Sequence, residues 1–241
     1  MKQILFIIAC VAIAGSSLTA AATEPAEKAS ASQMIAPATS NVPTIRPTSV
    51  EFMPDMTMEQ YNNLVERDPE TLVPVFSTLY DEGCSWYCGG SVLHVTATSQ
   101  HYPEAGFTYE ASNAHDFDHE SVWATEGSGV GESLTFTFAG NCPRITSVSI
   151  LNGHVKTKQA WANNSRVKSL LLYYNGKPYK MLQLEDSRSL QHFELGTLGY
   201  GPQAEVSTEW TLTFEIREVY PGKKYKDCVI ADFIFDGIDV H

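Results

Sequence analysis

Residues 132–138 and 210–219 alternate apolar and polar side chains with a period of two. In ESLTFTF, Leu134, Phe136 and Phe138 fall on one face, and serine and threonine fall on the other. The segment WTLTFEIREV repeats the same pattern. Because successive side chains of a strand point to opposite sides, both segments indicate strands with one buried face and one exposed face.

Further short strands are expected throughout the chain after residue 90, where helical patterning is nearly absent. The strand candidates are VLHVTATS, ITSVSIL, VKSLLLYY, YKMLQLE, QHFEL and CVIADFIF, and YNGKPY has the composition of a hairpin turn. Many short strands separated by turn residues predict an all-β sandwich or barrel. A segment of roughly 150 residues is long enough to bury a core of its own.

The N-terminus has the features of an export signal over residues 1–22. Lys2 precedes the apolar run ILFIIACVAIAG, and small residues follow, with Ala20–Ala22 fitting a cleavage site. The apolar run is too short to span a bilayer, and no later segment is apolar enough to do so. A lipid-anchor signal that uses Cys10 is the alternative interpretation.

Two more segments are expected before the strands begin. Residues 23–50 are rich in Ala, Ser, Thr and Pro, which predicts a flexible tether. Residues 51–83 predict a short helical segment. In it, Thr57 and Gln60 have the spacing of a capping box, and Asp68-Pro69 is a second start signal.

The formal net charge of −12 bears on possible partners. An acidic surface repels phosphate backbones, and the densest basic run, KKYK at 223–226, is short. The charge therefore argues against nucleic-acid binding.

Four cysteines lie outside the predicted signal, and an exported protein can keep disulfides. Three pairings are possible. Cys84 and Cys88 are close enough to pair across a turn, which would leave Cys142 and Cys228 to join distant parts of the chain. A metal site at the CSWYC segment is the alternative, although no second close pair of cysteines accompanies it.

The order of several motifs resembles the discoidin-like β-sandwich, which is shared by coagulation-factor C-type domains and many carbohydrate-binding modules. VTATS is followed by YEASNAHDFDHESVWAT, GESLTFTF, ITSVSI and VIADFIFDGI. The characteristic early loop of that fold matches Asn113, Asp116, Asp118, Ser121 and Trp123. The family usually has glycine where this chain has Phe117. The resemblance implies that Trp123 packs beneath the loop.

A closer resemblance is to the NADase-type glycan-binding domain group, which is frequent among exported bacterial proteins. It covers residues 84–241 and is carried by CSWYCGG, GSGVGESLTFTF, SILNGHVKTKQAWANNSRVKSLLLYYNG and VYPGKKYKDCVIADFIFDGIDVH. The resemblance implies a discoidin-like jelly-roll β-sandwich that binds glycans. The group's name does not imply NAD hydrolysis by this chain.

In discoidin-like modules the acidic loop either binds calcium or forms a structural turn without an ion. The resemblance implies Asp116, Asp118 and Ser121 as loop ligands and Asp232 as a ligand from the last strand, because hard oxygens suit Ca²⁺. Asp232 is one methylene shorter than the commoner glutamate. His115 and His119 raise a zinc site as the alternative, but no further His-rich motif accompanies them.

The segment NGHVKTKQAWANNSRVK, residues 152–168, lies between two predicted strands and is the candidate glycan-binding loop. An aromatic ring can stack on the apolar face of a sugar, while amides and a guanidinium bind hydroxyls or acidic groups. The predicted ligand-binding residues are Trp161, Asn163, Asn164 and Arg166, with Asn152, Lys156 and Trp86 in support. The alternative is that Trp161 folds onto the core.

The prediction is therefore an exported, non-catalytic glycan-binding protein. GSGVGE is followed by a strand and not by a helix, so it does not have the context of a phosphate loop. No Gly-x-Ser-x-Gly motif is present. Two alternatives stay open, a protein-interaction or surface-structural module without a sugar site and a hydrolase whose site is not recognised.

Overall fold

The computed structural model describes residues 41–68 and 85–240, and the predicted signal at 1–22, most of the tether, the second helix start and Cys84 lie outside them. The helical elements are α1 (Met58–Arg67), α3 (Lys158–Asn163) and the 3₁₀ turns η2 (Trp86–Cys88) and η3 (Ala111–His115). No helix in the described ranges has the length and apolar character needed to cross a membrane.

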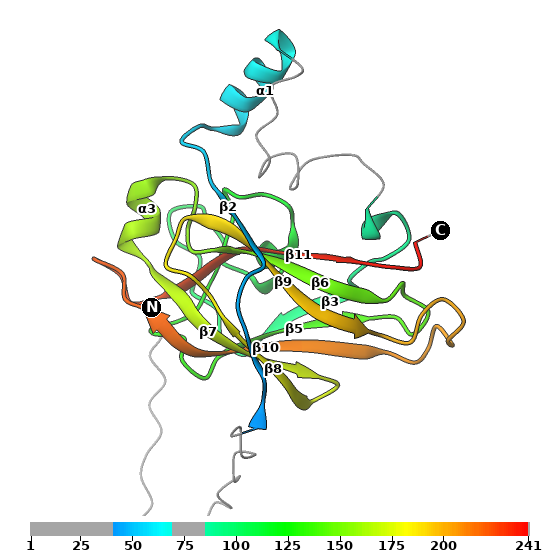
Figure 1. Cartoon of the computed structure of the whole chain (residues 1–241). Coiled ribbons are helices and arrows are strands. Elements are labelled where there is room, and N and C mark those ends of the chain that lie inside the picture. Colours follow the sequence, from blue (N-terminus) through cyan, green and yellow to red (C-terminus); the bar gives the residue numbers. More distant parts are fainter. Residues whose placement is uncertain (1–40, 69–84, 241) are drawn as a thin grey trace, which may run out of the picture. The chain divides into compact units, whose positions relative to one another are not determined.

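The strands are β1 (Thr44–Ile45), β2 (Ser49–Phe52), β3 (His94–Ala97), β4 (Trp123–Ala124), β5 (Ser133–Phe138), β6 (Ile145–Asn152), β7 (Ser165–Tyr174), β8 (Lys177–Gln183), β9 (Ser189–Leu198), β10 (Trp210–Tyr220) and β11 (Cys228–Gly237). Their hydrogen-bonded order is β2-β9-β6-β11-β7-β10-β5-β3, with β8 beside β7. β11 pairs with β6 along most of its length but with β7 only at Cys228 and Val229, so the sheet folds into two layers there (Figure 1).

Aromatic side chains from both layers fill the space between them. Phe136 of β5 and Phe214 of β10 both contact Phe233 of β11, with ring centroids 5.1 and 4.7 Å apart. Trp210 stacks on Phe138 at 4.3 Å. All of these rings are buried. The alternating apolar faces recognised in 132–138 and 210–219 therefore meet the apolar side of β11 to form the core.

Every strand candidate after residue 90 is confirmed, as is the sandwich. The YNGKPY turn joins β7 to β8, and Asn175 and Gly176 both adopt positive φ, as a tight hairpin requires. The capping box is also confirmed, since Thr57 and Gln60 exchange hydrogen bonds and α1 begins at Met58.

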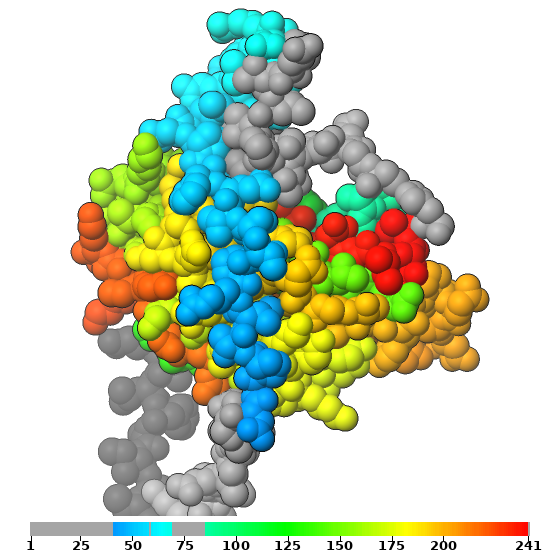
Figure 2. Space-filling model, viewed as in Figure 1, coloured from blue at the N-terminus to red at the C-terminus, as the bar shows by residue number. Residues whose placement is uncertain are grey.

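The expectation of a flexible tether up to residue 50 is wrong for its last part. β1 pairs with β8 in one layer, and β2 pairs with β9 in the other. Figure 2 shows this segment, in blue, lying against the yellow strand β9. Arg188 fixes its end by donating to the carbonyls of Met53 and Pro54. Backbone pairing at a sheet edge needs no apolar side chains, so composition alone could not reveal it.

The predicted disulfide between Cys142 and Cys228 is also wrong, because both cysteines carry free thiols. Cys228 begins β11, whereas Cys142 lies shortly before Ile145, which pairs with the other end of that strand. The ten residues of β11 separate them by about 30 Å, and a disulfide needs Cα atoms within about 7 Å. Cys88 also carries a free thiol. Its predicted partner Cys84 lies outside the described residues.

Thiol labelling tests this arrangement. Burial raises the pKa of Cys142, and it raises that of Cys228 to about 12, so neither thiol should react in the folded protein. Unfolding without a reductant should make both react with an alkylating agent, as measured by peptide mass spectrometry. A pre-reduced sample is the control. A cross-linked peptide that contains both cysteines would contradict the assignment.

Candidate functional site

The connection between β6 and β7 contains a short helix where the sequence suggested only a loop. The Thr157 side chain accepts a hydrogen bond from the backbone N–H of Ala160 at 3.0 Å and so caps α3. At the other end, Asn164 Nδ2 donates to the carbonyl of Ala160. The helix therefore fixes the backbone of the residues predicted to bind a glycan.

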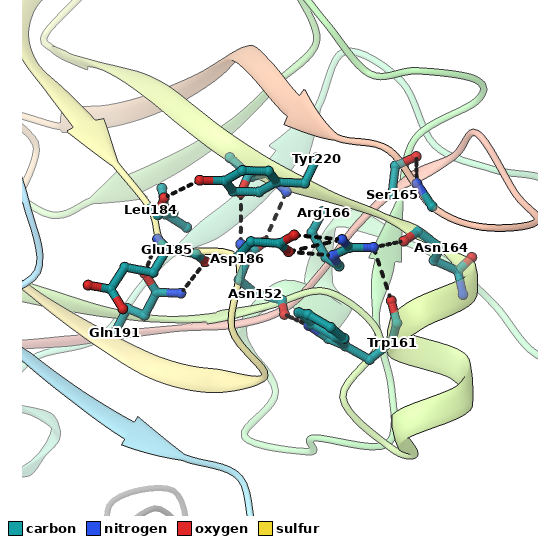
Figure 3. A network of polar contacts seen from close by, with 12 residues as sticks. Asn152, Trp161, Asn164, Ser165, Arg166, Leu184, Glu185, Asp186, Gln191 and Tyr220 are labelled. Carbon is teal, nitrogen blue, oxygen red and sulfur yellow. Dashed lines mark hydrogen bonds and ion pairs between the residues drawn. The ribbon is translucent and has the colours of Figure 1, made fainter.

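Arg166 and Trp161 form an internal network in this connection (Figure 3). Arg166 is only 6% exposed and binds the carboxylate of Asp186 through Nε and Nη2, at 2.9 and 3.0 Å. Its Nη1 donates to the carbonyl of Asn164 at 2.9 Å, and its guanidinium lies 4.4 Å from the centre of the Trp161 ring. Trp161 in turn donates from Nε1 to the carbonyl of Asn152. The structure thus uses Arg166 to hold the connection together.

Three further predicted residues have structural contacts as well. Asn152 is buried and exchanges hydrogen bonds with the backbone N–H and carbonyl of Val167. Trp86 is fully buried and donates to the carbonyl of Pro143, so the prediction that η2 presents its ring to a ligand is wrong. Lys156 is exposed but forms an ion pair with Glu120 at 2.8 Å. The buried side chains of Asn152, Arg166 and Trp86 cannot meet a ligand in this structure.

Asn163 and Asn164, by contrast, line an open pocket of about 430 Å³ beside α3. Its floor consists of the buried apolar residues Val122, Ala124 and Val229 from the strand ends beneath. These three residues belong to a buried hydrophobic cluster that also contains Leu151 and Ala231 and is separate from the aromatic core between the layers. We call this hollow the α3 pocket.

Aromatic and imidazole rings form the walls of the α3 pocket. His101 and Tyr109, from the connection between β3 and η3, meet edge to face at 5.2 Å. Tyr225, from the connection between β10 and β11, is 43% exposed, and its N–H binds the carbonyl of Asn163. His154 also lines the pocket, and burial lowers its pKa, which favours a neutral ring. Three segments that are far apart in the sequence therefore converge on one hollow.

The amides of the α3 pocket are arranged by their neighbours. Gln159 donates from Nε2 to Oδ1 of Asn163 at 2.8 Å, which orients the Asn163 amide with its Nδ2 group away from that contact. Sequence reasoning identified both asparagines but missed the residues of the other two segments. The available signal was weak, because the exposed aromatic residues of HYPEAGFTY and KKYKD are scattered singly along the chain.

The acidic loop forms a turn that satisfies its own carboxylates. Asp116 accepts from the backbone N–H of Asp118 and from the hydroxyl of Ser121, at 2.9 and 2.5 Å. Asp118 accepts from the N–H of Glu120. Phe117 adopts φ 61°, the left-handed conformation that suits the family's glycine at this point, and its ring packs on Tyr87 at 4.9 Å. Contact with Tyr87 offsets the cost of that backbone conformation, about 1–2 kcal/mol.

Near this loop, Trp123 lies within the core, and the partly buried His115 packs against the core rings of Phe136 and Phe235. Trp123 is fully buried and donates to the carbonyl of Ser99, which confirms that it packs beneath the loop. The His115 ring is largely buried, with Nδ1 2.7 Å from the carbonyl oxygen of Phe233, and burial lowers its pKa. Within the described ranges, no group of three or more His, Cys, Asp or Glu side chains is arranged to hold a metal ion.

The predicted calcium site depends mainly on the environment of Asp232. Its carboxyl group is fully buried, and neither oxygen has a hydrogen-bond partner that meets normal geometry. Burial raises its pKa strongly, and the charges of Asp116 and Asp118 add to that effect, although the N–H groups of Phe233 and Phe117 oppose it. The carboxyl can therefore be protonated or be balanced by a cation, and Ca²⁺ would find hard oxygens on Asp232 and Asp116.

The two-layered β-sandwich and its strand order are those of the discoidin-like class. The sequence places the chain within one family of that class. The chain belongs to the family described as the NAD glycohydrolase translocation F5/8 type C domain, which it matches over residues 86–236, more than half of its 241 residues. This result confirms the predicted fold and family.

Several solved structures are similar at low sequence identity. A carbohydrate-binding module of Clostridium perfringens, CpGH89CBM32-5, in complex with GalNAc-β-1,3-galactose, has a TM-score of 0.41 and 18% identity, with 60% of this chain and 94% of that chain covered. The CBM32 of AlyQ, in complex with 4,5-unsaturated mannuronic acid, gives 0.34 and 10%, with coverages of 61% and 95%. A chitosan-binding module from a chitosanase/glucanase of Paenibacillus sp. IK-5 gives 0.34 and 15%, with coverages of 62% and 97%. Comparison with curated protein sequences gives no match.

Substitution of Arg166 tests its structural role. Arg166→Met should lower the free energy of unfolding by about 1–3 kcal/mol, because the guanidinium is buried and its loss leaves the carbonyls of Asn164 and Trp161 without their donor, whereas the exposed Asp186 can be hydrated. Chemical denaturation measures this change. Lys158→Met is the matched control, because its ion pair with Asp55 is exposed and should contribute little to stability. Equal stability of the Arg166→Met protein and the wild type would contradict this role.

The pH dependence of stability tests Asp232. Its pKa is raised in the folded state, so the folded protein retains this proton to higher pH than the unfolded chain does. In the presence of a chelator, raising the pH from about 4 to 8 should therefore lower the thermal midpoint of the wild type more than that of Asp232→Asn.

The same pair of proteins tests calcium. If the ion binds beside Asp232, adding CaCl₂ at pH 8 should raise the thermal midpoint of the wild type by a few degrees and leave that of Asp232→Asn unchanged. An unchanged wild-type midpoint would contradict calcium binding and would mean that the acidic turn forms without an ion.

Proposed function

We propose that this protein is an exported, non-catalytic glycan-binding protein and that the α3 pocket is its binding site. The supporting observation is the combination of an apolar floor, two tyrosine rings and oriented amides in one open hollow of about 430 Å³. Export is supported by the signal-like sequence at residues 1–22 and by the family description.

The chemistry of the α3 pocket suits a sugar ring. The exposed face of Tyr225 can stack on the apolar face of a pyranose. The amides of Asn163 and Gln159 and the hydroxyl of Tyr109 can exchange hydrogen bonds with sugar hydroxyls. Gln159 and Asn163 stand on α3, and the N–H of Tyr225 is bonded to the carbonyl of Asn163, so this part of the site is formed before the ligand arrives, which reduces the entropy lost on binding.

Of the four main residues that the sequence predicts to bind a ligand, two line the pocket and two position the segment that carries it. Asn163 and Asn164 remain ligand-binding candidates because they line the pocket. Trp161 and Arg166 are positioning residues, since they hold the connection that carries α3. Lys156 stands near the pocket but is paired with Glu120.

Tyr225→Ala should weaken glycan binding about tenfold or more, because it removes the stacking surface. A glycan array should first identify a ligand, and isothermal titration should then compare the variants. Tyr200→Ala is the matched control, since Tyr200 is 46% exposed but lies in the connection between β9 and β10, away from α3. If only Tyr200→Ala weakened binding, the glycan site would lie in the connection between β9 and β10, and the proposed site would be wrong.

The same experiments separate the two alternatives. A protein-interaction module predicts no signal on the array, together with a protein partner that Tyr225→Ala fails to bind. A hydrolase predicts turnover of a chromogenic glycoside or ester panel, lost in Asp227→Asn because Asp227 is a carboxylate of the pocket.

A further inference from the structure

The charged side chains that line the α3 pocket are all acidic. Glu104 comes from the connection between β3 and η3, and Asp227 comes from the connection between β10 and β11, while neither lysine nor arginine is present in the lining. We propose that the α3 pocket selects glycans that carry a free, protonated amino group, as in glucosamine, over neutral and acidic glycans. This inference rests on the proposed function.

Both carboxylates stand on defined backbone positions. The N–H and carbonyl of Glu104 exchange hydrogen bonds with Phe107, at 3.1 and 2.9 Å, across a turn in which Ala105 and Gly106 have positive φ. Asp227 Oδ1 accepts from the N–H of Gly127 at 2.9 Å, which orients its carboxylate. The two charges are thus held by the fold and are not carried on a loosely placed chain.

The two carboxylates act on the same region of the pocket. Tyr109 has its pKa raised by burial first, and then by the negative charges of Glu104 and Asp227 and by Tyr225. The hydroxyl of Tyr109 therefore lies within the field of both acids. A cation bound beside Tyr109 would be attracted by both of them and by the faces of the tyrosine rings.

Three of the nearby positive side chains form ion pairs with acids outside the pocket lining. Lys156 is paired with Glu120, Lys158 with Asp55 and Arg166 with Asp186. Lys224 lies over the ring of Tyr225, 4.7 Å from its centre, so it contributes a positive charge beside the pocket, although it does not line it. Glu104 and Asp227 form no ion pair with another described residue, so their charges remain available to a ligand.

The wall contains two imidazoles, His101 and His154, and that of His154 does not oppose a cation. Burial lowers the pKa of His154, with Lys156 contributing in the same direction, so its imidazole is neutral near pH 7. The formal net charge of −12 for the whole chain adds a long-range attraction for cationic ligands, which salt screens. Selectivity that arises in the pocket must therefore be separated from attraction by the surface as a whole.

Isothermal titration of the full chain with two trisaccharides tests the inference. One contains three glucosamine residues with free amines, and the other contains three N-acetylglucosamine residues. At pH 6 and low salt, the free-amine trisaccharide should bind at least about tenfold more tightly, with one molecule bound per chain. Glu104→Gln and Asp227→Asn should each remove most of this advantage. The asparagine can still accept from Gly127, so the loop should keep its conformation.

Glu209→Gln is the matched control. Glu209 is exposed and immediately precedes β10, whereas Asp227 follows the other end of that strand. This variant has the same net charge as Glu104→Gln. Because Glu209 does not line the pocket, the variant should bind the free-amine trisaccharide as the wild type does. Equal weakening by all three variants would assign the effect to general surface charge and overturn the inference.

The outcomes also separate this inference from the proposed function. If the two trisaccharides bind equally, or the acetylated one binds more tightly, and Tyr225→Ala weakens both, the α3 pocket is a glycan site without the proposed charge selectivity. If neither trisaccharide nor any array glycan binds, the proposed function and the inference both fail.

Discussion

The contact between β11 and the aromatic rings of the opposite layer is the interaction on which the rest of the structure depends. β11 is hydrogen-bonded to β6 along most of its length and to β7 at its start, so it belongs to both layers. Its phenylalanines pack against rings from β5 and β10. With β11 fixed, the segments at its N-terminal end have a rigid base, and the α3 pocket lies there.

Polar residues at this end of the sandwich have two separate tasks. Arg166 uses all of its nitrogen atoms on Asp186 and on backbone carbonyls, so it stabilises a connection that carries α3. Asn163 and Tyr225 are held by neighbouring groups but keep part of their surface toward the open hollow. Because the guanidinium of Arg166 binds the acceptors around it, the connection is rigid, and the amides and rings of the pocket remain at fixed positions for a ligand.

The sequence predicted the features that depend on local pattern. Alternation located the strands, a capping box located the start of α1, and motif order identified the fold and the burial of Trp123. Ligand contact depends instead on partners that are distant in the chain. Whether Arg166 faces solvent is decided by Asp186, and the burial of Trp86 is decided by packing near Pro143. The α3 pocket combines three separate connections, and no single stretch of sequence displays it.

The pairing of residues 44–52 with β8 and β9 redefines where the folded domain begins. A fragment cut at residue 84, where the motif resemblance starts, would uncover the outer edges of both strands, with their backbone N–H and carbonyl groups unpaired. Bare edges of this kind recruit strands from other molecules. Self-association of such a fragment would reflect the missing N-terminal cover, and its oligomers would be a poor guide to how the intact protein behaves.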